Sequence, residues 1–281
     1  MMSIEPKPDQ IRKSKNILVA ILLAGYSGLA IAPVTAQTTG SQLVVNSNQD
    51  GEIQADQGLT LREAIAIANG TLKLDQLSPA EKAQVTVAPT GATAIRITFN
   101  LPTGQTQIQL TKALPALEQP VEIDGTSQPG YIADQQLIDE IAAVRVPVVE
   151  ITPAPGQEIL RGLTIVANNT TIRGLSLYGF TSSHTDTAST PPADIFIAHR
   201  LPPPDISQQE PPATSAPFND VPPNNIRLEN NWLGIRPDQT MPVTPSAFGV
   251  SVFNATNVTI TQNWIANHDG SGIITSVNAV T

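Results

Sequence analysis

Two segments near the C-terminus repeat the same order of residue types. Asn225–Gly234 reads NIRLENNWLG, and Asn257–Ala266, 32 residues further on, reads NVTITQNWIA. A second pair, Gly249–Val252 and Gly272–Thr275, is offset by 23 residues, and a loop at Pro237–Pro245 accounts for the difference. Short alternating strands with Asn and Gly corners, repeated every ~20–30 residues, are typical of a stacked β-solenoid.

The repeat predicts an all-β protein, a single-stranded right-handed parallel β-helix in which matching side chains of successive coils lie in columns. We expect Trp232 to lie against Trp264, and Ile226 to lie beside Val258 on a parallel strand. If the two tryptophans are exposed, they form a platform on which sugars stack. If they are buried, they belong to the core, which their aliphatic neighbours favour.

The composition fits a protein made mostly of strands. The 281 residues are only 14% charged and 4% aromatic, with a formal charge of −9 and no cysteine. A chain this acidic is not expected to bind nucleic acid or anionic lipid, because binding to either requires a basic protein surface. Without cysteine there is neither a disulfide framework nor thiolate chemistry.

Residues 1–36 have the three parts of a secretory signal peptide. Basic residues between positions 12 and 15 lead into the apolar run Ile17–Ile31, and Val34–Ala36 offers small residues for cleavage. A transmembrane anchor is the alternative, but the run is short for a membrane span. We therefore expect an exported protein, in the periplasm, at the cell surface or outside the cell, with no membrane span after the signal is removed.

Residues 37–92 are predicted to form a strand and helical cap over the first coil. Thr60 and Glu63 have the spacing of a capping box, and Asn69–Gly70 supplies a left-handed stop. A second helix is expected to begin at Ser78–Glu81, with Pro at its first position. A solenoid needs such a cover because bare strand edges and apolar ends aggregate.

Two stretches carry a resemblance to known families. Leu59–Ala64 (LTLREA) resembles the motif of the CSLREA-domain proteins, exported bacterial proteins with this segment before a β-helix; here Leu59 replaces the motif Cys and Thr60 the Ser. Ile97–Gly130 and Gly162–Leu175 resemble recurrent segments of right-handed, pectin-lyase-like β-helices. The resemblance implies a fold but no one activity, since this fold hosts lyases, hydrolases, adhesins and inert spacers.

The remaining residues, 93–281, are assigned to the β-helix, with a Pro-rich loop insertion at 187–223. Pro cannot donate to a strand ladder, so the ten prolines of Pro191–Pro223 indicate an excursion from one turn, either a tolerated side loop or a flap over a groove. Asp194–Ile197 has the pattern of a strand. The last coil ends at Thr281 without a capping segment, so we expect that the natural chain continues, or that another subunit covers this end.

One segment partly matches a calcium-binding loop. Asn46, Asn48 and Asp50 place oxygen ligands at alternate positions before Gly51, but Gln57 stands where the closing Glu would be. An ordinary polar turn is the simpler interpretation, and calcium is the one cofactor that the sequence admits.

Catalytic signals are weak. His268–Gly272 resembles a Gly-His-Gly element of pectin-degrading hydrolases but lacks the paired aspartates nearby, and its residues also suit a turn. The other candidate carboxylates look scattered, without a consistent basic partner: Glu122, Asp124, Asp186 and Asp194. Asn231 above Asn263 indicates a corner amide ladder rather than sugar binding.

The sequence thus favours an exported scaffold that is adhesin-like or binds carbohydrate, without catalysis of its own. Its expected partner is an extracellular polysaccharide or a cell-surface component, and not nucleic acid. The alternative is a polysaccharide lyase or glycoside hydrolase acting on an acidic polysaccharide, which would require three carboxylates in one groove beside Arg173, Arg227 or Arg236. A third possibility is a secretion passenger whose active domain lies in a continuation of the chain.

Overall fold

The strands of the protein form three sheets. A computed structural model describes residues 40–88, 94–132, 145–181, 191–199 and 221–275, all within one compact unit, Thr38–Thr281. The predicted signal peptide lies outside these residues. In order of pairing, sheet A contains β14 (Thr256–Thr261), β11 (Asn224–Glu229), β8 (Thr170–Arg173), β5 (Val121–Asp124), β3 (Ile95–Phe99), β1 (Ser41–Val45) and β2 (Val85–Thr86).

In the other two sheets, too, the order of pairing runs from the C-terminal strand back toward the N-terminus. Sheet B contains, in order of pairing, β15 (Trp264–Ile265), β12 (Trp232–Leu233), β9 (Leu175–Leu177), β6 (Val149–Pro153) and β4 (Gln107–Leu110). Sheet C contains β16 (Ile273–Thr275), β13 (Val250–Val252), β10 (Ala193–Ile197) and β7 (Arg161–Ile165).

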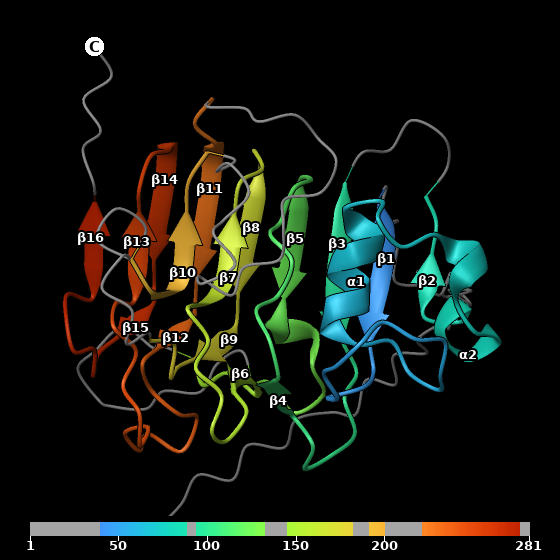
Figure 1. Ribbon diagram of the computed structural model, residues 1–281, viewed down its shortest axis with the longest axis horizontal. Coiled ribbons are helices and arrows are strands. Elements are labelled where there is room, and N and C mark those ends of the chain that lie inside the picture. Colours follow the sequence, from blue (N-terminus) through green and yellow to red (C-terminus); the bar gives the residue numbers. More distant parts are fainter. Residues whose placement is uncertain (1–39, 89–93, 133–144, 182–190, 200–220, 276–281) are drawn as a thin grey trace, which may run out of the picture. The chain divides into compact units, whose positions relative to one another are not determined.

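The chain visits the three sheets in a repeating order. From β8 onward it passes through sheets A, B and C three times, as β8–β9–β10, β11–β12–β13 and β14–β15–β16. Each strand pairs in parallel with the strand one circuit later, so every circuit adds one rung (Figure 1). The all-β class is confirmed, as are the two predicted pairings, Ile226 with Val258 and Trp232 with Trp264.

The core is built from columns of inward-facing aliphatic side chains. In sheet A the register aligns Ile97, Ile123, Ile172, Leu228 and Ile260 on five successive strands. The first four have no exposed surface, and Ile260 on the last rung is half-buried. Alternation along each strand sends the intervening polar residues outward, so the columns fix which face of the sheet is solvated.

The corners between sheets A and B use left-handed backbone. Gly174, Asn230 and Gln262 each follow the sheet A strand of their rung, and their φ angles are 68°, 55° and 55°. Next to this column, the Asn231 side chain accepts from the Leu175 N–H and donates to the Ile172 carbonyl, and the Asn231 N–H donates to Asn263. The predicted amide ladder is therefore confirmed as a corner device.

The N-terminal segment closes one end of sheet A. α1 (Leu61–Ala68) begins at the predicted capping box and packs on β1 and β3, while α2 (Pro79–Lys82) begins at Ser78 as expected. The 3-10 turns are η1 (Leu74–Gln76) and η2 (Gly125–Ser127). β1 is itself a parallel rung on β3, and β2 pairs antiparallel with the other edge of β1 (Figure 1). The end is thus closed by an antiparallel strand and short helices.

The range 187–223 is not a loop throughout. The predicted strand at Asp194–Ile197 is confirmed within β10, whose five residues are all buried between β7 and β13 in sheet C. The loop interpretation of this range is therefore wrong for 193–197, because these apolar residues complete a rung. Most of the prolines that prompted it lie outside the described residues.

Replacing Asn231 with Ala tests the corner ladder. The change leaves the buried Leu175 N–H and Ile172 carbonyl without partners, so we expect the free energy of unfolding to fall by about 2–4 kcal/mol. Asn263→Ala, on the half-buried last rung, is the matched control and should cost about 1 kcal/mol, because water can replace its bonds. Denaturant unfolding measures both; equal losses would contradict the ladder's role.

Candidate functional site

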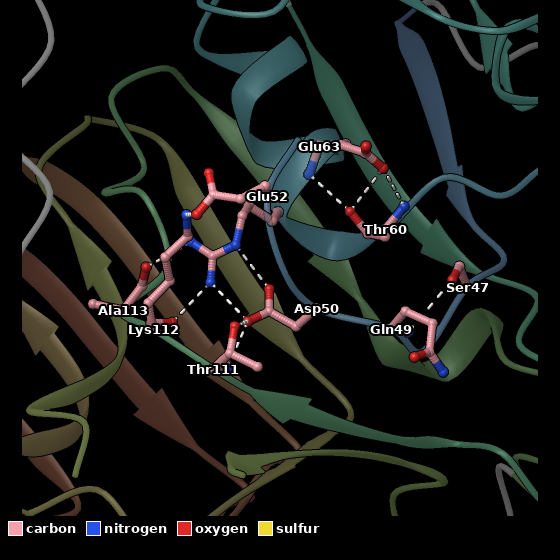
Figure 2. Close-up of polar contacts among 10 residues, drawn as sticks. Ser47, Gln49, Asp50, Glu52, Thr60, Glu63, Thr111, Lys112 and Ala113 are labelled. Atoms are coloured by element: carbon pink, nitrogen blue, oxygen red, sulfur yellow. Dashed lines mark hydrogen bonds and ion pairs between the residues drawn. The ribbon is translucent and has the colours of Figure 1, made fainter. Parts of the chain in front are cut away.

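The predicted calcium turn is held by structural hydrogen bonds. The Asn46 side chain accepts from the Leu59 N–H at 2.7 Å, and the Asn48 side chain donates to the Gln107 carbonyl at 3.1 Å. The Asp50 carboxylate accepts from the Thr111 N–H at 2.7 Å (Figure 2). Asn46 thus bonds within the cap, whereas Asn48 and Asp50 join the cap to the segment that contains β4.

Asp50 is also half of a buried ion pair. Arg62 on α1 donates from Nε and Nη2 to the two carboxylate oxygens at 2.8 and 2.9 Å, and to the carbonyls of Lys112 and Ala113. The Asp50 side chain is 1% exposed. Within the described ranges, no three His, Cys, Asp or Glu residues gather closely enough to hold a metal. Calcium binding stays a prediction, and a cation would compete with Arg62 for Asp50.

Asp50→Asn tests whether this carboxylate serves the fold. The variant leaves the Arg62 guanidinium buried without its counter-charge, so we expect a loss of about 3–5 kcal/mol in unfolding free energy. Asn48→Ala, which removes one half-buried hydrogen bond, should cost about 1 kcal/mol. The wild-type melting temperature should be the same in calcium and in EGTA. A calcium-dependent rise that Asn48→Ala abolishes would establish the metal site instead.

Charged side chains on the outer face of sheet A lie together. Arg96, Glu122, Asp124 and Arg173 come from β3, β5 and β8; Arg173 Nη2 is 2.9 Å from carboxylate oxygens of both Glu122 and Asp124, and Arg96 also contacts Asp124. The prediction that Glu122 and Asp124 lack a basic partner is therefore wrong. Asp124 is 28 residues from Arg96 and 49 residues from Arg173 in the sequence, and only the parallel register brings these side chains together.

The surroundings of Asp124 and Arg173 favour the charged forms of these two groups. Burial alone would raise the pKa of Asp124, but the hydrogen bonds and charges of Arg173, Thr126 and Arg96 outweigh it and lower the pKa. Burial opposes the charge of Arg173 too, yet Asp124, Glu122 and Glu229 raise its pKa. A carboxylate held ionised cannot act as a general acid, and an arginine held protonated cannot act as a base.

A second polar cluster, around Asp194, is buried between sheet C and two loops. His268 Nε2 lies 2.9 Å from Asp194 Oδ2, and the Ser246 hydroxyl donates to Asp194 Oδ1. The Ser246 oxygen in turn accepts from the backbone N–H groups of Gly179 and Phe180. The side chains of Asp194 and His268 are 0% and 1% exposed. The sequence singled out His268 but could not pair it with Asp194, 74 residues earlier.

This arrangement is not a nucleophilic triad. Ser246 and His268 both contact Asp194, so the histidine is not placed between the serine and the acid, as a general base must be. Both the serine and the aspartate have no exposed surface. His268 Nδ1 is buried without a hydrogen-bond partner among the described residues. The cluster ties three circuits of the chain together, since its members come from β10, the loop before β13 and the loop after β15.

The Asp194 cluster predicts a pH dependence of stability. Burial raises the pKa of Asp194 from 3.8 to about 6, although His268 and Ser246 oppose the shift. The folded protein therefore binds more protons than the unfolded chain between pH ~4 and ~6, and this group's contribution to stability falls as the pH rises through that window, by at most about 3 kcal/mol.

Asp194→Asn removes the titration while keeping the side-chain shape. Denaturant unfolding between pH 4 and 7 should show a weaker decline of stability in the variant than in the wild type. Asp269→Asn, at a neighbouring exposed position, is the control and should leave the wild-type slope unchanged. Parallel pH profiles for Asp194→Asn and the wild type would contradict the assignment.

The tryptophan pair does not form a flat platform. The ring centroids of Trp232 and Trp264 are 4.7 Å apart, but the planes are inclined by 71°, edge to face. Trp232 has no exposed surface and Trp264 is half-buried. Of the two alternatives, the core interpretation is therefore confirmed for Trp232, and a sugar ring cannot stack across both tryptophans.

A cleft lies over the outer face of sheet B. It has a volume of about 620 Å³, and the loop between β12 and β13, which contains the predicted Pro237–Pro245 loop, forms one wall. Amide, hydroxyl and charged groups alternate with proline and glycine along it: Gln107, Gln109, Thr152, Pro153, Ala154, Pro155, Gly156, Gln157, Glu158, Tyr178, Gly179, Thr181, Arg236, Pro242, Val243 and Thr244.

A hydrogen-bonded group holds the floor of this cleft in place. The Tyr178 hydroxyl donates to Glu150 at 2.6 Å, and Gln107 donates to the Tyr178 oxygen at 2.8 Å, while Gln109 donates to Gln107. Burial raises the pKa of Tyr178, and Glu150 raises it further, so the phenol stays protonated. Arg236 lies 6.0 Å from the centre of the Tyr178 ring.

The rim of the cleft combines apolar and polar groups. Val243 is 99% exposed and the neighbouring Met241 is 70% exposed, on the same loop as Arg236. Gln109, which also lines the cleft, is exposed as well. Exposed apolar side chains beside amide and guanidinium donors suit a ligand that itself has apolar faces and many hydroxyls. Sequence analysis named Arg236 but missed the glutamines, because nothing in the local pattern distinguishes them from other outward-facing residues.

The chain has no match among protein-family models, curated proteins or solved structures. The resemblance of Leu59–Ala64 to the CSLREA motif therefore stays a prediction. No helix among the described residues is long and apolar enough to cross a membrane.

Proposed function

We propose that this chain is an exported scaffold, a right-handed parallel β-helix of the pectin-lyase-like type, that binds carbohydrate through the cleft over sheet B. The cyclic order of strands through three parallel sheets supports the β-helix, because repeated passage through the same three sheets is how such a coil grows. Parallel crossovers are right-handed in nearly all proteins, which supports the handedness. The apolar run at Ile17–Ile31 supports export.

The sheet B cleft carries the binding proposal. It places Gln109, Arg236 and the exposed Val243 around a hollow of about 620 Å³, large enough for one or two sugar rings. Amides and guanidinium groups hydrogen-bond to sugar hydroxyls, while aliphatic side chains cover the C–H faces of the ring. The partner would be a polysaccharide outside the cell or at the cell surface.

A polysaccharide lyase or hydrolase acting on an acidic polysaccharide is the second candidate. One observation favours it: Glu122, Asp124 and Glu229 all interact with Arg173 on the outer face of sheet A, which is the grouping that such an enzyme would require. The lowered pKa of Asp124 and the raised pKa of Arg173 count against proton transfer there. The scaffold is therefore the better supported proposal.

A glycan panel followed by calorimetry tests carbohydrate binding. We expect Gln109→Ala and Arg236→Ala to weaken binding of the best glycan by about tenfold each, since each removes donors from the cleft. Arg227→Ala, on the outer face of sheet A, is the matched control and should bind as the wild type does. Failure to bind any glycan, or equal effects at all three positions, would overturn the proposal.

The same panel separates the two candidates. Release of unsaturated or reducing sugars by the wild type, lost in Arg173→Ala and kept in Arg236→Ala, would establish the enzyme instead of the scaffold. Binding without product release is the outcome expected for the scaffold.

A further inference from the structure

The Glu150 carboxylate sets the direction of the hydrogen bonds along the floor of the sheet B cleft. An ionised carboxylate only accepts, so the Tyr178 hydroxyl, 2.6 Å away, must direct its one proton to Glu150. Burial raises the pKa of Tyr178 and the charge of Glu150 raises it further, so the phenol keeps this proton. The Tyr178 oxygen is left with lone pairs only, and any further partner must donate to it.

This direction passes through Gln107 to Gln109. Gln107 lies opposite Glu150 in the register of β4 and β6. Its side-chain nitrogen is 2.8 Å from the Tyr178 oxygen and 3.3 Å from a Glu150 oxygen, so both of its amide protons have acceptors there. Its own oxygen must therefore face Gln109, whose side-chain nitrogen donates to it at 2.8 Å. The carboxylate thus decides, through two intermediate side chains, which end of the Gln109 amide faces Gln107.

Gln109 keeps a defined set of free groups. Its Oε1 and one amide proton have no hydrogen-bond partner among the described residues, and the residue is exposed where it lines the cleft. A sugar hydroxyl both donates and accepts, so it can bond with the amide oxygen and with the amide proton. A carboxylate has no proton to give to the oxygen. Gln109 therefore suits a hydroxyl group better than an acid group.

The charges around the cleft favour the same kind of ligand. Glu158 lines the cleft and Glu150 lies at its floor, against Arg236, the one basic residue among the described lining residues. Asp238 Oδ1 lies 3.9 Å from Arg236 Nε and offsets part of that positive charge. Acidic groups thus outnumber basic ones in this part of the structure. An anionic ligand would meet net repulsion here, and an uncharged one would not.

We propose that the cleft over sheet B selects uncharged glycans, and that Glu150 is a positioning residue that fixes the orientation of the Gln109 amide for their hydroxyl groups. The proposal rests on the proposed function, because it names the class of carbohydrate that the same cleft takes. Glu150 is not itself among the described lining residues, so its effect on binding reaches Gln109 through the hydrogen-bonded chain.

Paired oligosaccharides test the selectivity. Calorimetry compares oligomers of glucose, mannose and galactose with the matched oligomers in which each hydroxymethyl group is oxidised to a carboxylate. We expect the uncharged member of the best pair to bind at least about tenfold more tightly. Equal or tighter binding of the acidic member would overturn this proposal and leave carbohydrate binding intact. Failure of every oligomer to bind would overturn the proposed function, and this proposal with it.

A double-mutant cycle tests the role of Glu150. In Glu150→Gln the new amide can donate to the Tyr178 oxygen, which allows the bonds of the two glutamines to reverse. We expect binding of the uncharged oligomer to weaken about fivefold, but by less than about twofold in the Gln109→Ala background, because the effect passes through that amide. Glu52→Gln is the matched control, since it removes the same charge from the exposed cap, and it should bind as the wild type does.

The Gln109 side-chain amide gives a readout that needs no ligand. Its NMR resonances should shift in Glu150→Gln and in Tyr178→Phe, and should stay in place in Glu52→Gln. Additive losses in the double-mutant cycle, or Gln109 resonances that do not respond to Glu150→Gln, would show that Glu150 only supports the fold and would overturn its positioning role.

Discussion

Parallel backbone pairing between successive rungs is the interaction on which the rest of this structure depends. Each residue of β11 takes its place from the register with β8 on one side and β14 on the other. A shift of one residue would turn Ile226 and Leu228 outward and bring Arg227 into the core. The aliphatic columns and the outward charged columns are therefore two consequences of the same pairing, and neither can change alone.

The rungs tolerate loops of very different length because only the strands must stay in register. In sheet A, the column residues Ile97, Ile123, Ile172, Leu228 and Ile260 are separated by 26, 49, 56 and 32 residues. Between β12 and β13 the additional residues leave the stack as one loop. This loop contributes to two of the polar sites, since it supplies Arg236 to the cleft and Ser246 to the Asp194 cluster.

Local sequence patterns predicted much of the fold. The capping box of Thr60 and Glu63 and the Asn231–Asn263 ladder were predicted because each depends on residues close in sequence or on a visible repeat. The range 187–223 was assigned to a Pro-rich loop, although Asp194–Ile197 within it has the pattern of a strand. That strand forms as β10, whose place is decided by its neighbours in sheet C and not by its own surroundings in the sequence.

The candidate sites were harder to predict from the sequence than the fold. Asp50 was singled out for its spacing, yet its carboxylate is taken by Arg62, which reaches it through helix α1. Two ion pairs could not be predicted from the sequence: Glu122 with Arg173, and Asp194 with His268. The number of residues between the partners depends on the lengths of the intervening loops, and these lengths show no regular period.

The amino-acid sequence by itself determined the elements of this protein: alternating strands, Asn and Gly corners, a capped helix and a surface poor in charge. These follow from local backbone preferences and from the periodicity of side chains, which any short window contains. Only the tertiary structure decided which polar groups meet, namely Arg173 with Asp124, His268 with Asp194, and Tyr178 with Glu150. The reason is that loops of unequal length leave no fixed spacing in the sequence between residues that face each other on successive rungs, and register is a property of pairs of strands and not of either strand alone.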